Sequence, residues 1–598
     1  MAVTPGNDII VGSIRSTVKI NGAVLSDSFG ISEINVYHAI NQISYAELTI
    51  VGEDPSNASL PSQDGTTFIP GSPITVTVGY DSNAEVLIFD GVIVQQGVEI
   101  AKKTPLKLTL LCKHKLVTAT YNRKDEEFHD KTDSKIISTI LTAYGVTASV
   151  DSTSITYEVL LQKLATDWDF VCSRAQFNGF FITMDGTSVN VKKPVFTSSS
   201  VLTIAYGISI INFKGEVSAE RQPPTLDASG WDIKTMALIK SDAAEPSLNS
   251  QGNLTPKTLS GKLSQTKLSL VSNTLMTTAD LKAWADGILL KLRLAAIRGE
   301  VTYIGNSVAK TGDIITFEGV GGKFNGSAFV SAVTHKIKPK GGWETTVQFG
   351  LDDSFVHEKM NVNYPSATGQ LPAISGLQIG KVKQLSKDPQ SLNRILVLLQ
   401  TNATTKTGFW ARYANFYATS GAGAGFLPEV DDEVVVGFLE NDPRNPVVLG
   451  SLYGKNAPAN VPADDKNFIK EIQTKAKLKI NFDDENKIIT ITTPGKNLIT
   501  FDDKAKQISI NDQNKNTIVM SSTGIAFTSD KDIKLTAKGS IILDATSKLT
   551  LTAKQDASVG GLNVKIEAKA GLTAKGTSKA EFTSGGQTVL KGALVNIN

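Results

Sequence analysis

The sequence is short of the residues from which catalytic and metal centres are built. Its 598 residues include two cysteines and five histidines. Cys112 and Cys172 cannot form a disulfide framework for a chain of this length, and their apolar neighbours predict buried free thiols. No histidine pairs with another histidine or with a cysteine at metal-ligand spacing; the five are His38, His114, His129, His335 and His357. We therefore expect no metal, no cofactor and no catalytic residue.

Signals for nucleic acids, membranes and general secretion are missing too. The formal net charge of +2 is close to balance, which predicts neither a nucleic-acid partner nor an anionic membrane surface. No stretch approaches the ~18 to 20 apolar residues of a membrane span. Residues 1–12 lack the cationic start and apolar core of a secretion signal. We expect assembly in the reducing cytoplasm and export by another route.

What the sequence does contain is strand signal, mixed with a few helices over residues 1–365. Strands are predicted at 13–20, 43–51, 74–78, 86–94 and 106–112. Helices are predicted at 136–144, ended by Gly145, at 159–175, closed by Asn178 and Gly179, and at 278–292. Residues 215–260 have few large apolar side chains, which predicts a long surface excursion.

The composition then changes twice. Residues 371–457 predict a small β-barrel, with strands at 395–399, 434–439 and 447–452. Residues 465–598 are rich in Thr, Lys, Asp, Ser, Gly and Ala, and carry short apolar pairs with almost no helical periodicity. The chain is therefore expected to be mostly β, with an α+β first domain, and to form three domains: 1–365, 371–457 and 465–598.

The apolar pairs of the last domain recur every eight residues. The pairs are Ile533/Leu535, Ile541/Leu543, Leu549/Leu551 and Ala557/Val559, with small residues in phase at Ala537, Ala545 and Ala553. A looser series runs upstream, from Ile480/Phe482 to Ile525/Phe527. A short period kept along a whole domain is typical of a repeat architecture.

A short strand with two apolar side chains cannot bury them alone, and a single row of such strands exposes its edges. Three copies wound about one axis solve both problems, because the pairs fill a central core and each edge pairs with a neighbouring chain. The predicted trimer core is Ile533, Leu535, Ile541, Leu543, Leu549, Leu551 and Val559. The alternative is a single-chain β-solenoid, whose coils usually need longer repeats of about 18 residues.

Residues 420–453 carry the most specific pattern, SGAGAGFLPEVDDEVVVGFLENDPRNPVVLGSLY. This segment resembles the OB-fold segment of the VgrG/phage baseplate spike family, with its glycine-rich turn, its V-G-F-L-E-G-D-P stretch and its R-P-V-V-x-G-S-L-Y ending. Trp410 and Arg412 fall where that family has a W-x-R strand. Asp431 and Asn441 stand where it usually has glycine.

Other stretches are similar to the same family, in the same order. Residues 167–179, with Asp167, Trp168, Arg174, Asn178 and Gly179, resemble its W-D-F-x-x-R-A-E-x-N-G motif. Residues 346–350 resemble the end of its hub domain, and residues 586–598 look like a spike tip.

The resemblance implies a homotrimeric spike at the tip of a contractile injection apparatus. It implies a hub of two β-barrel modules in residues 1–365, fitting a hexameric inner tube, an OB-fold collar in 371–457 and a triple-stranded β-helix needle in 465–598. Baseplate proteins, effector cargo and, transiently, a target membrane are the other implied partners. The particle would be delivered outside the cell or into a target cell. A PAAR-type protein is implied to cap the tip at Leu594, Val595, Asn596, Ile597 and Asn598.

Two other classes of function stay open. The acidic clusters at 431–433 and 440–442 could supply the carboxylate pair of a glycoside hydrolase, which makes a tail hub with cell-wall-degrading activity one alternative. A glycan-binding adhesin is the other. Only residues 455–464 separate barrel and repeats, which is too short for an inserted enzyme. The run from Gly421 to Gly425 lacks the Lys-Ser/Thr ending of a phosphate loop and predicts a turn.

Overall fold

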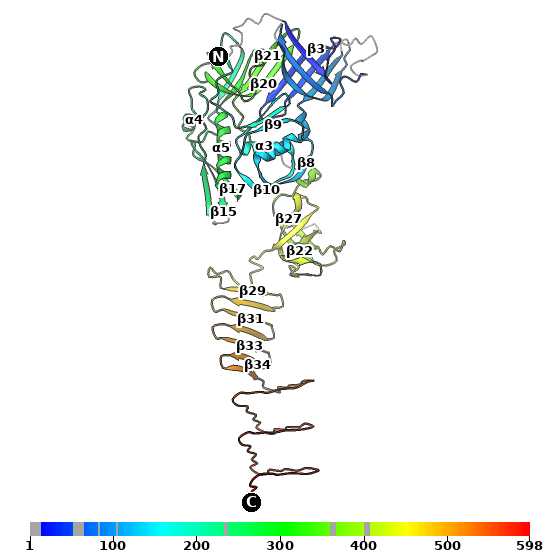
Figure 1. Ribbon diagram of the computed structural model, residues 1–598, viewed down its shortest axis with the longest axis vertical. Helices are drawn as coiled ribbons and strands as arrows, with labels where there is room; N and C mark the ends of the chain where they lie inside the picture. Colours follow the sequence, from blue (N-terminus) through cyan, green and yellow to red (C-terminus); the bar gives the residue numbers. More distant parts are fainter. Residues whose placement is uncertain are drawn as a thin grey trace. The chain divides into compact units, whose positions relative to one another are not determined.

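The computed structural model describes residues 13–51, 65–81, 84–102, 106–232, 237–358, 366–399 and 407–597 (Figure 1). It divides into two compact units, residues 1–452 and residues 453–598. Strands predominate in both, and among the described residues α-helices occur in the first unit alone. The fold is mostly β, as predicted.

Unit 1 contains a 13-stranded sheet ordered β14-β18-β21-β20-β3-β4-β7-β6-β5-β1-β2, with β13 and β19 attached beside β20. Its earlier strands are β1 (Ile14–Ile20), β2 (Ala23–Val24), β3 (Gly30–Ala39), β4 (Tyr45–Val51), β5 (Pro73–Tyr80), β6 (Val86–Glu99) and β7 (Lys107–Lys113). Its later strands are β13 (Leu202–Ala205), β14 (Ile210–Val217), β18 (Ile297–Ile304), β19 (Ile314–Glu318), β20 (Gly326–Lys338) and β21 (Gly342–Phe349). The five strands predicted between residues 13 and 112 are confirmed as β1, β4, β5, β6 and β7.

The sheet is packed around two separate hydrophobic cores. One lies among β1 to β7 and includes the fully buried Leu48. The other lies among the later strands and includes the fully buried Tyr303. The two halves join where β3 pairs with β20, with His38 opposite Val333. The two expected modules therefore share one hydrogen-bonded sheet.

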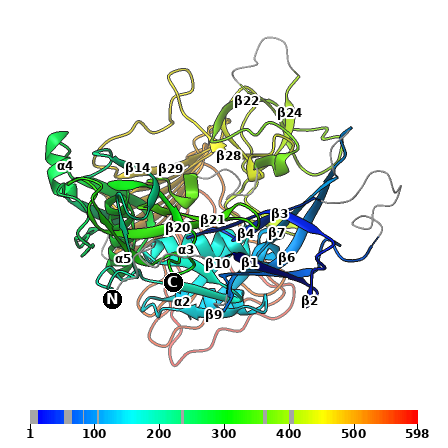
Figure 2. The same ribbon diagram turned by 90° about the horizontal axis from the view of Figure 1, so that it is seen from above.

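A third core lies beneath two helices. α2 (Asp133–Thr142) and α3 (Asp167–Phe177) contact each other, and they pack on the two-stranded sheet of β8 and β10 (Figure 2). The short elements around them are η2 (Lys115–Thr120), β8 (Arg123–Thr132), β9 (Thr147–Val150), β10 (Thr156–Thr166), β11 (Phe181–Asp185) and β12 (Ser188–Lys192). The shared core includes Ile137 and Val171. The helix predicted at 136–144 is confirmed as α2.

The helix predicted at 159–175 is wrong in its first half. Residues up to 166 belong to β10, which pairs with β8, and only the second half is helical, as α3. Thr166 sets the boundary, because its Oγ1 accepts a hydrogen bond from the Asp169 N–H at 3.0 Å and caps the helix. The predicted end is confirmed, since Asn178 is the C-cap and Gly179 has a φ of 67°.

The surface excursion predicted at 215–260 is also wrong. β15 (Leu226–Asp232), β16 (Ala237–Asp242) and β17 (Leu268–Leu275) form a three-stranded sheet, and α4 spans Pro256–Lys262. The sheet packs on α5 (Thr278–Leu294), the third predicted helix, and buries Leu226 and Ala228 there. A sheet covered on one face needs only every second residue to be apolar, so a low apolar content does not exclude strands.

The last part of unit 1 is the predicted small barrel. Five strands close in the order β22-β23-β24-β28-β27. They are β22 (Gln378–Gln384), β23 (Ile395–Leu399), β24 (Phe409–Tyr413), β27 (Glu433–Phe438) and β28 (Pro446–Ser451). Short 3-10 turns lie at η3 (Val356–Glu358), η4 (Ser366–Gly369) and η6 (Leu439–Asn441), and a small hairpin at β25 (Ala418–Thr419) and β26 (Ala422–Gly423). Valines at 382, 397, 434, 436 and 448 fill the barrel.

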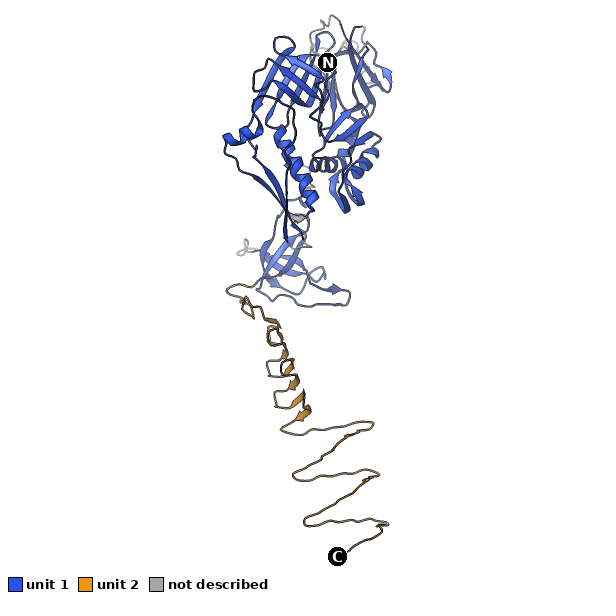
Figure 3. Ribbon diagram, turned by 60° about the vertical axis from the view of Figure 1, so that its left-hand side comes forward, with its two compact units in different colours: residues 1–452 blue, residues 453–598 orange. Residues whose placement is uncertain are grey.

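Unit 2 opens with a seven-stranded antiparallel sheet in which each strand pairs with the next one in the chain (Figure 3). The strands are β29 (Ile469–Gln473), β30 (Lys479–Asp483), β31 (Ile488–Thr492), β32 (Leu498–Asp502), β33 (Gln507–Asn511), β34 (Thr517–Ser521) and β35 (Gly524–Thr528). Beyond Thr528, the described residues up to 597 contain no helix or strand.

Candidate functional site

The sheet of unit 2 carries its large apolar side chains on one face. Ile480 lies opposite Ile491, and Phe482 lies opposite Ile489. The same register continues from strand to strand and produces two unbroken columns. The first column is Ile472, Ile480, Ile491, Ile499, Ile510, Ile518 and Phe527, and the second is Phe482, Ile489, Phe501, Ile508, Met520 and Ile525. Because side chains alternate along a strand, both columns share one face.

That apolar face is uncovered in a single chain. Its side chains at positions 480, 482, 489, 491, 501, 508, 510 and 520 are 37% to 42% exposed. The opposite face has a polar central column of Asn481, Thr490, Thr500 and Ser509, of which Ser509 is buried. Sheets in water normally bury their apolar face, so this face is a candidate interface.

The turns of the sheet fix pairing within the chain. Lys477, Lys487, Lys496, Lys506 and Lys515 all adopt left-handed backbone conformations, with φ between 52° and 70°. These hairpins correct the expectation that every strand edge pairs with a neighbouring chain. Between residues 469 and 528 each strand pairs with the next one in the chain, with starts nine or ten residues apart up to β34 and seven residues apart from β34 to β35.

The predicted trimer-core residues lie in the part without strands. Ile533, Leu535, Ile541, Leu543, Leu549, Leu551 and Val559 are 53% to 79% exposed, so a single chain does not bury them. Leu594, Val595, Asn596 and Ile597 at the predicted tip are exposed as well. Asn598 lies outside the described residues.

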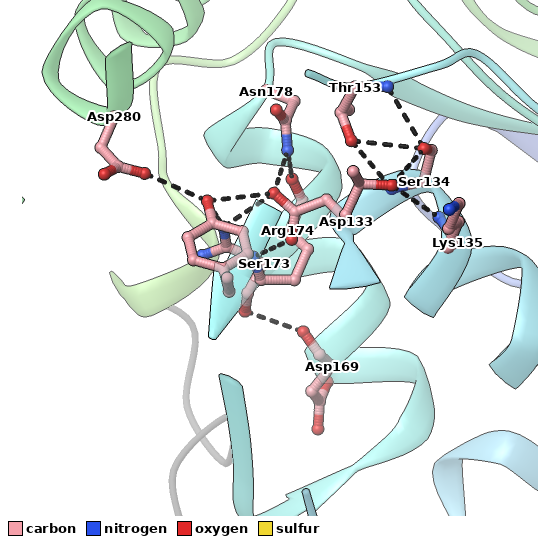
Figure 4. Close-up of polar contacts among 11 residues, drawn as sticks. Asp133, Ser134, Lys135, Thr153, Asp169, Ser173, Arg174, Asn178 and Asp280 are labelled. Carbon is pink, nitrogen blue, oxygen red and sulfur yellow. Dashed lines mark hydrogen bonds and ion pairs between the residues drawn. The ribbon is translucent and has the colours of Figure 1, made fainter. Parts of the chain in front are cut away.

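In unit 1, Arg174 and Asn178 of the stretch at residues 167–179 form a buried polar cluster with Asp133, which we call the clamp (Figure 4). Arg174 donates from Nε and Nη2 to the two carboxylate oxygens of Asp133, at 2.6 and 2.8 Å. Asn178 Nδ2 donates to the same carboxylate at 2.8 Å. Asp133 is fully buried, and the bidentate arginine and the amide compensate the cost of burying its charge. No local pattern predicted Asp133 as the partner, because it lies 41 residues from Arg174 in the chain.

The clamp extends to a further helix through Tyr157. Burial raises the pKa of Tyr157 well above its usual range, so the hydroxyl stays protonated. Its oxygen accepts from Arg174 Nη2 at 2.8 Å and lies 3.2 Å from Asp280 of α5. The clamp therefore joins α2, α3, β10 and α5, which is a structural role.

One carboxylate of each acidic cluster of the barrel is engaged in an ion pair. Asp431 Oδ1 lies 2.9 Å from Lys381 Nζ, and Asp442 Oδ2 lies 2.6 Å from Arg444 Nη2. Hydrogen bonds from Lys381 and Arg444 hold the pKa of these carboxyls below its usual range. A glycoside hydrolase needs one carboxyl with a raised pKa, so neither group fits the general-acid role.

The buried histidines are held by hydrogen bonds. His114 Nε2 lies 3.0 Å from the Gly186 carbonyl oxygen, and His335 Nδ1 lies 3.1 Å from Thr345 Oγ1. Burial lowers the pKa of His114 to about 4 and that of His335 to about 3. Across the residues that the structure describes, no three potential ligands gather as a metal site would require. In the same residues, no helix combines the length and apolar character of a membrane span.

The glycine run is a projecting hairpin, as its composition predicted. It lies at the turn between β25 and β26, and Gly421 has a φ of 72°. Phe416, Tyr417 and Phe426 flank it and are exposed. These aromatic residues were not predicted as functional, although the uncharged run from Tyr413 to Pro428 that contains them was a usable signal.

Comparisons with known proteins were made for the sequence and the fold. Residues 11–339 match the family described as Alg8 N-terminal domain, and residues 378–453 match the family described as type VI secretion system/phage-baseplate injector OB domain. No curated protein matches the sequence.

Several solved structures are distantly similar. The 43 kDa tail protein of prophage MuSo2 from Shewanella oneidensis is 12% identical over 57% of this chain and 99% of that chain, with a TM-score of 0.44. The c3393 protein of E. coli, a component of the type VI secretion system, is 12% identical over 73% and 99%, with a TM-score of 0.36. A chain of the Francisella PdpA-VgrG complex is 10% identical over 87% and 81%, with a TM-score of 0.39.

The family assignment rests on the two matched families rather than on these distant likenesses. The first match spans more than half of the chain, and the second covers the closed barrel, where residues 420–453 carry the specific motif. The chain belongs to the Alg8 N-terminal domain family and, through its injector OB domain, to the VgrG/phage baseplate spike family.

Proposed function

We propose that the protein is a non-enzymatic, homotrimeric spike that adapts the inner tube of a contractile injection apparatus to a membrane-piercing needle. The observation that carries this proposal is the state of residues 529–597. From Asp530 onward every one of them is exposed in the single chain, including large apolar side chains, and none of residues 529–597 belongs to a strand. Such a segment leaves backbone groups and apolar surface unsatisfied, and further chains can satisfy both.

The repeat favours three copies of the same chain as those partners. Three sheets of residues 469–528, with their apolar columns turned inward, close into a prism with one shared core. Below them, the eight-residue pairs from Ile533 to Val559 stack along the same axis, with strand edges paired between chains. The narrow axis suits the small residues at Ala537, Ala545 and Ala553.

For the other parts of the chain, the proposed roles are those that the corresponding parts have in the VgrG/phage baseplate spike family. Residues 1–365 form the hub, whose two-core sheet in three copies presents six modules to a hexameric inner tube. Residues 371–457 form the collar and 465–598 the needle. A PAAR-type protein caps Leu594 to Asn598, baseplate proteins and effector cargo bind the spike, and the target membrane is touched in passing. Assembly takes place in the cytoplasm, and contraction then delivers the spike outside the cell or into a target cell.

Two features support a mechanical rather than an enzymatic role. The buried charges of the Asp133–Arg174 clamp are paired with each other, and the barrel carboxyls at Asp431 and Asp442 are paired with basic side chains. The clamp pairs its buried charges within the fold, and neither barrel carboxyl has the raised pKa that a general acid needs.

Sedimentation equilibrium of the full-length protein tests the proposal. We expect a species of three times the mass of the chain, and cell-wall zymography of the same sample without hydrolysis. A folded protein that sediments as a single copy contradicts the trimer, and a cleared zone on the gel contradicts the non-enzymatic role.

A further inference from the structure

The collar contains a long segment between two barrel strands that is not itself part of the closed barrel. Residues 414–430 leave the barrel after β24 and return before β27. The arm is anchored where the Ala414 N–H donates to the Val448 carbonyl and the Asp431 N–H donates to the Val382 carbonyl, both at 2.9 Å. Between these anchors the sole charged residue is Glu429. We call this segment the collar arm.

The collar arm exposes apolar side chains to an unusual degree. Phe416 is 89% exposed, and Tyr417, Phe426, Leu427 and Val430 are 47% to 56% exposed. Its hairpin consists of two register pairs, Ala418 with Gly423 and Thr419 with Ala422. A hairpin this short is not stable by itself in water, and solvated loops normally carry polar side chains. An arm with this composition needs a surface to lie on.

The same barrel has such a surface on its outer face. There β22, β27 and β28 point apolar residues outward, where a barrel strand facing water usually alternates to polar residues. Ile379 lies opposite Val435, and Gly437 lies opposite Val447. We call the group Leu377, Ile379, Val435, Gly437, Val447 and Leu449 the barrel patch.

Gly437 makes a hollow in the barrel patch. A Cβ atom at this position would lie 3.5 Å from Leu377 Cδ2 and 3.7 Å from Leu449 Cδ1, so the two leucines converge over the glycine. Both leucines are still more than half exposed, at 64% and 51%. A shallow apolar hollow between two leucines suits an aromatic ring, which buries much area at little entropic cost.

The occupant that fits the barrel patch is the collar arm of another copy of this chain. Every copy offers one arm and one patch, and such a head-to-tail contact closes into a ring under rotational symmetry. The inference rests on the proposed trimer, because residues 452–468 are the sole link between β28 and β29. A needle of three chains would therefore hold three collars at high effective concentration.

We propose that the collar arm of one protomer seats Phe416 and its apolar neighbours on the barrel patch of the next protomer, so that three arms and three patches close the collar. The contact is matched by shape and apolar area rather than by charge, since the arm contributes one carboxylate and no basic group.

Photo-crosslinking of the full-length protein tests this contact. A benzoylphenylalanine replaces Phe416, and unlabelled protein is co-assembled with 15N-labelled protein so that links between copies are recognised by mass. We expect links between copies that map to the peptides containing Leu377, Ile379 or Leu449. Leu449→Asp should reduce these links at least ten-fold, and because Leu449 is exposed the barrel core is left intact. The matched control places the photo-reactive residue at the exposed Lys387 and should give no link to the barrel patch.

The outcomes separate the arm contact from the trimer itself. Links from position 416 that stay within one chain, or that map between copies but outside the barrel patch, overturn the arm contact while sedimentation still reports a trimer. An unchanged link yield in Leu449→Asp also overturns it. A protein that sediments as a single copy overturns the proposed function and the arm contact together.

Discussion

The repeat region, residues 469–597, has two halves, which differ in whether their strands form backbone hydrogen bonds within one chain. Residues 469–528 form a sheet from one chain, with consecutive strands paired throughout. Residues 529–597 have the same kind of apolar pairs but no strand within the described chain. Strand starts are nine or ten residues apart from β29 to β34 and seven residues apart from β34 to β35, and every one of these steps closes a hairpin within the chain. The lower series keeps an eight-residue step, and its strand edges are not paired within the described chain.

One repeat region can therefore present two kinds of interface. The upper half, residues 469–528, satisfies its backbone alone and leaves an apolar face for a partner. The lower half, residues 529–597, needs a partner for its backbone and its side chains alike, so its order depends on assembly. Variants in the lower half should therefore affect assembly more strongly than matched variants in the upper half.

The largest effect is expected from Leu551→Asp in the lower half. Leu551 is 77% exposed in the single chain, so assembly removes most of its surface from water. In the proposed trimer this variant places three carboxylates on the axis, and each uncompensated buried charge costs several kcal/mol. We expect sedimentation equilibrium to detect no trimer. The neighbouring Thr550→Asp, whose side chain has the opposite orientation along an extended chain, is the control and should remain trimeric. A trimeric Leu551→Asp protein means that the inward assignment is wrong.

A smaller effect is expected from Ile491→Asp in the upper half. Ile491 is already partly covered by its column neighbours, so less of its surface is buried on assembly. We expect the trimer to dissociate ~10- to 100-fold more readily, a change of about 1.4 to 2.7 kcal/mol. The backbone ladder of β30 to β32 should keep its protection from amide exchange.

Thr490→Asp, on the polar face of the same strand, is the control for Ile491→Asp and should change dissociation by less than about three-fold. Loss of amide protection in Ile491→Asp would contradict the idea that the upper half is built by one chain.

Acid should lower the folding stability of the hub more than that of the repeat region. All five histidines lie at or before residue 357, so the repeat region has none. Burial lowers the pKa of His114 to about 4 and of His335 to about 3, so the unfolded chain takes up protons near pH 6.5 while the folded hub does not. The contribution of these histidines to hub stability is therefore complete above pH 6.5. It falls as the pH is lowered, by up to ~1.4 kcal/mol per pH unit for each histidine.

Differential scanning calorimetry between pH 7 and pH 5, combined with amide exchange, measures this effect. We expect the hub transition to move to lower temperature while the protection of β30 to β34 stays unchanged. The double variant His114→Gln/His335→Gln should have a shallower pH dependence of hub stability. A repeat region that loses protection first would contradict the assignment.

Helices and strands whose signal lies within one continuous segment of the sequence were predicted correctly. Strands β1 and β4 to β7, helices α2 and α5 and the small barrel all have their signals within one element. The errors came from competing local signals. The apolar spacing from Val159 to Ala175 fits a helix, but the capping threonine at 166 moves the helix start to Asp167. Likewise, low apolar content hid β15, because the polar Asp227 and Ser229 are buried there beside the apolar Leu226 and Ala228.

The site was less predictable because its geometry depends on long-range pairing. The pairs from Ile480 to Phe527 were interpreted as a looser form of the eight-residue repeat, but their strands pair with their neighbours in the same chain. The clamp partner of Arg174 lies in another helix, and no single-sequence signal connects Asp133 to it. Burial of Leu551 or Val559 depends on copies of the chain that a single sequence does not specify.

The smallest effect is expected at the turns that distinguish the two halves. Lys506 has a φ of 52°, a conformation that costs a non-glycine residue roughly 1–2 kcal/mol. Lys506→Gly relieves this cost but gains entropy in the unfolded chain, so we expect the upper half to be stabilised by ~0.5 kcal/mol for each chain. Lys504→Gly changes the same turn at a position without positive φ and should destabilise it by ~0.5–1 kcal/mol. The free energy of opening of the β32 and β33 amides, measured by hydrogen exchange, compares the two variants. Equal effects of the two glycines would mean that the hairpin is not formed within the chain, and the contrast between the upper and lower halves would disappear.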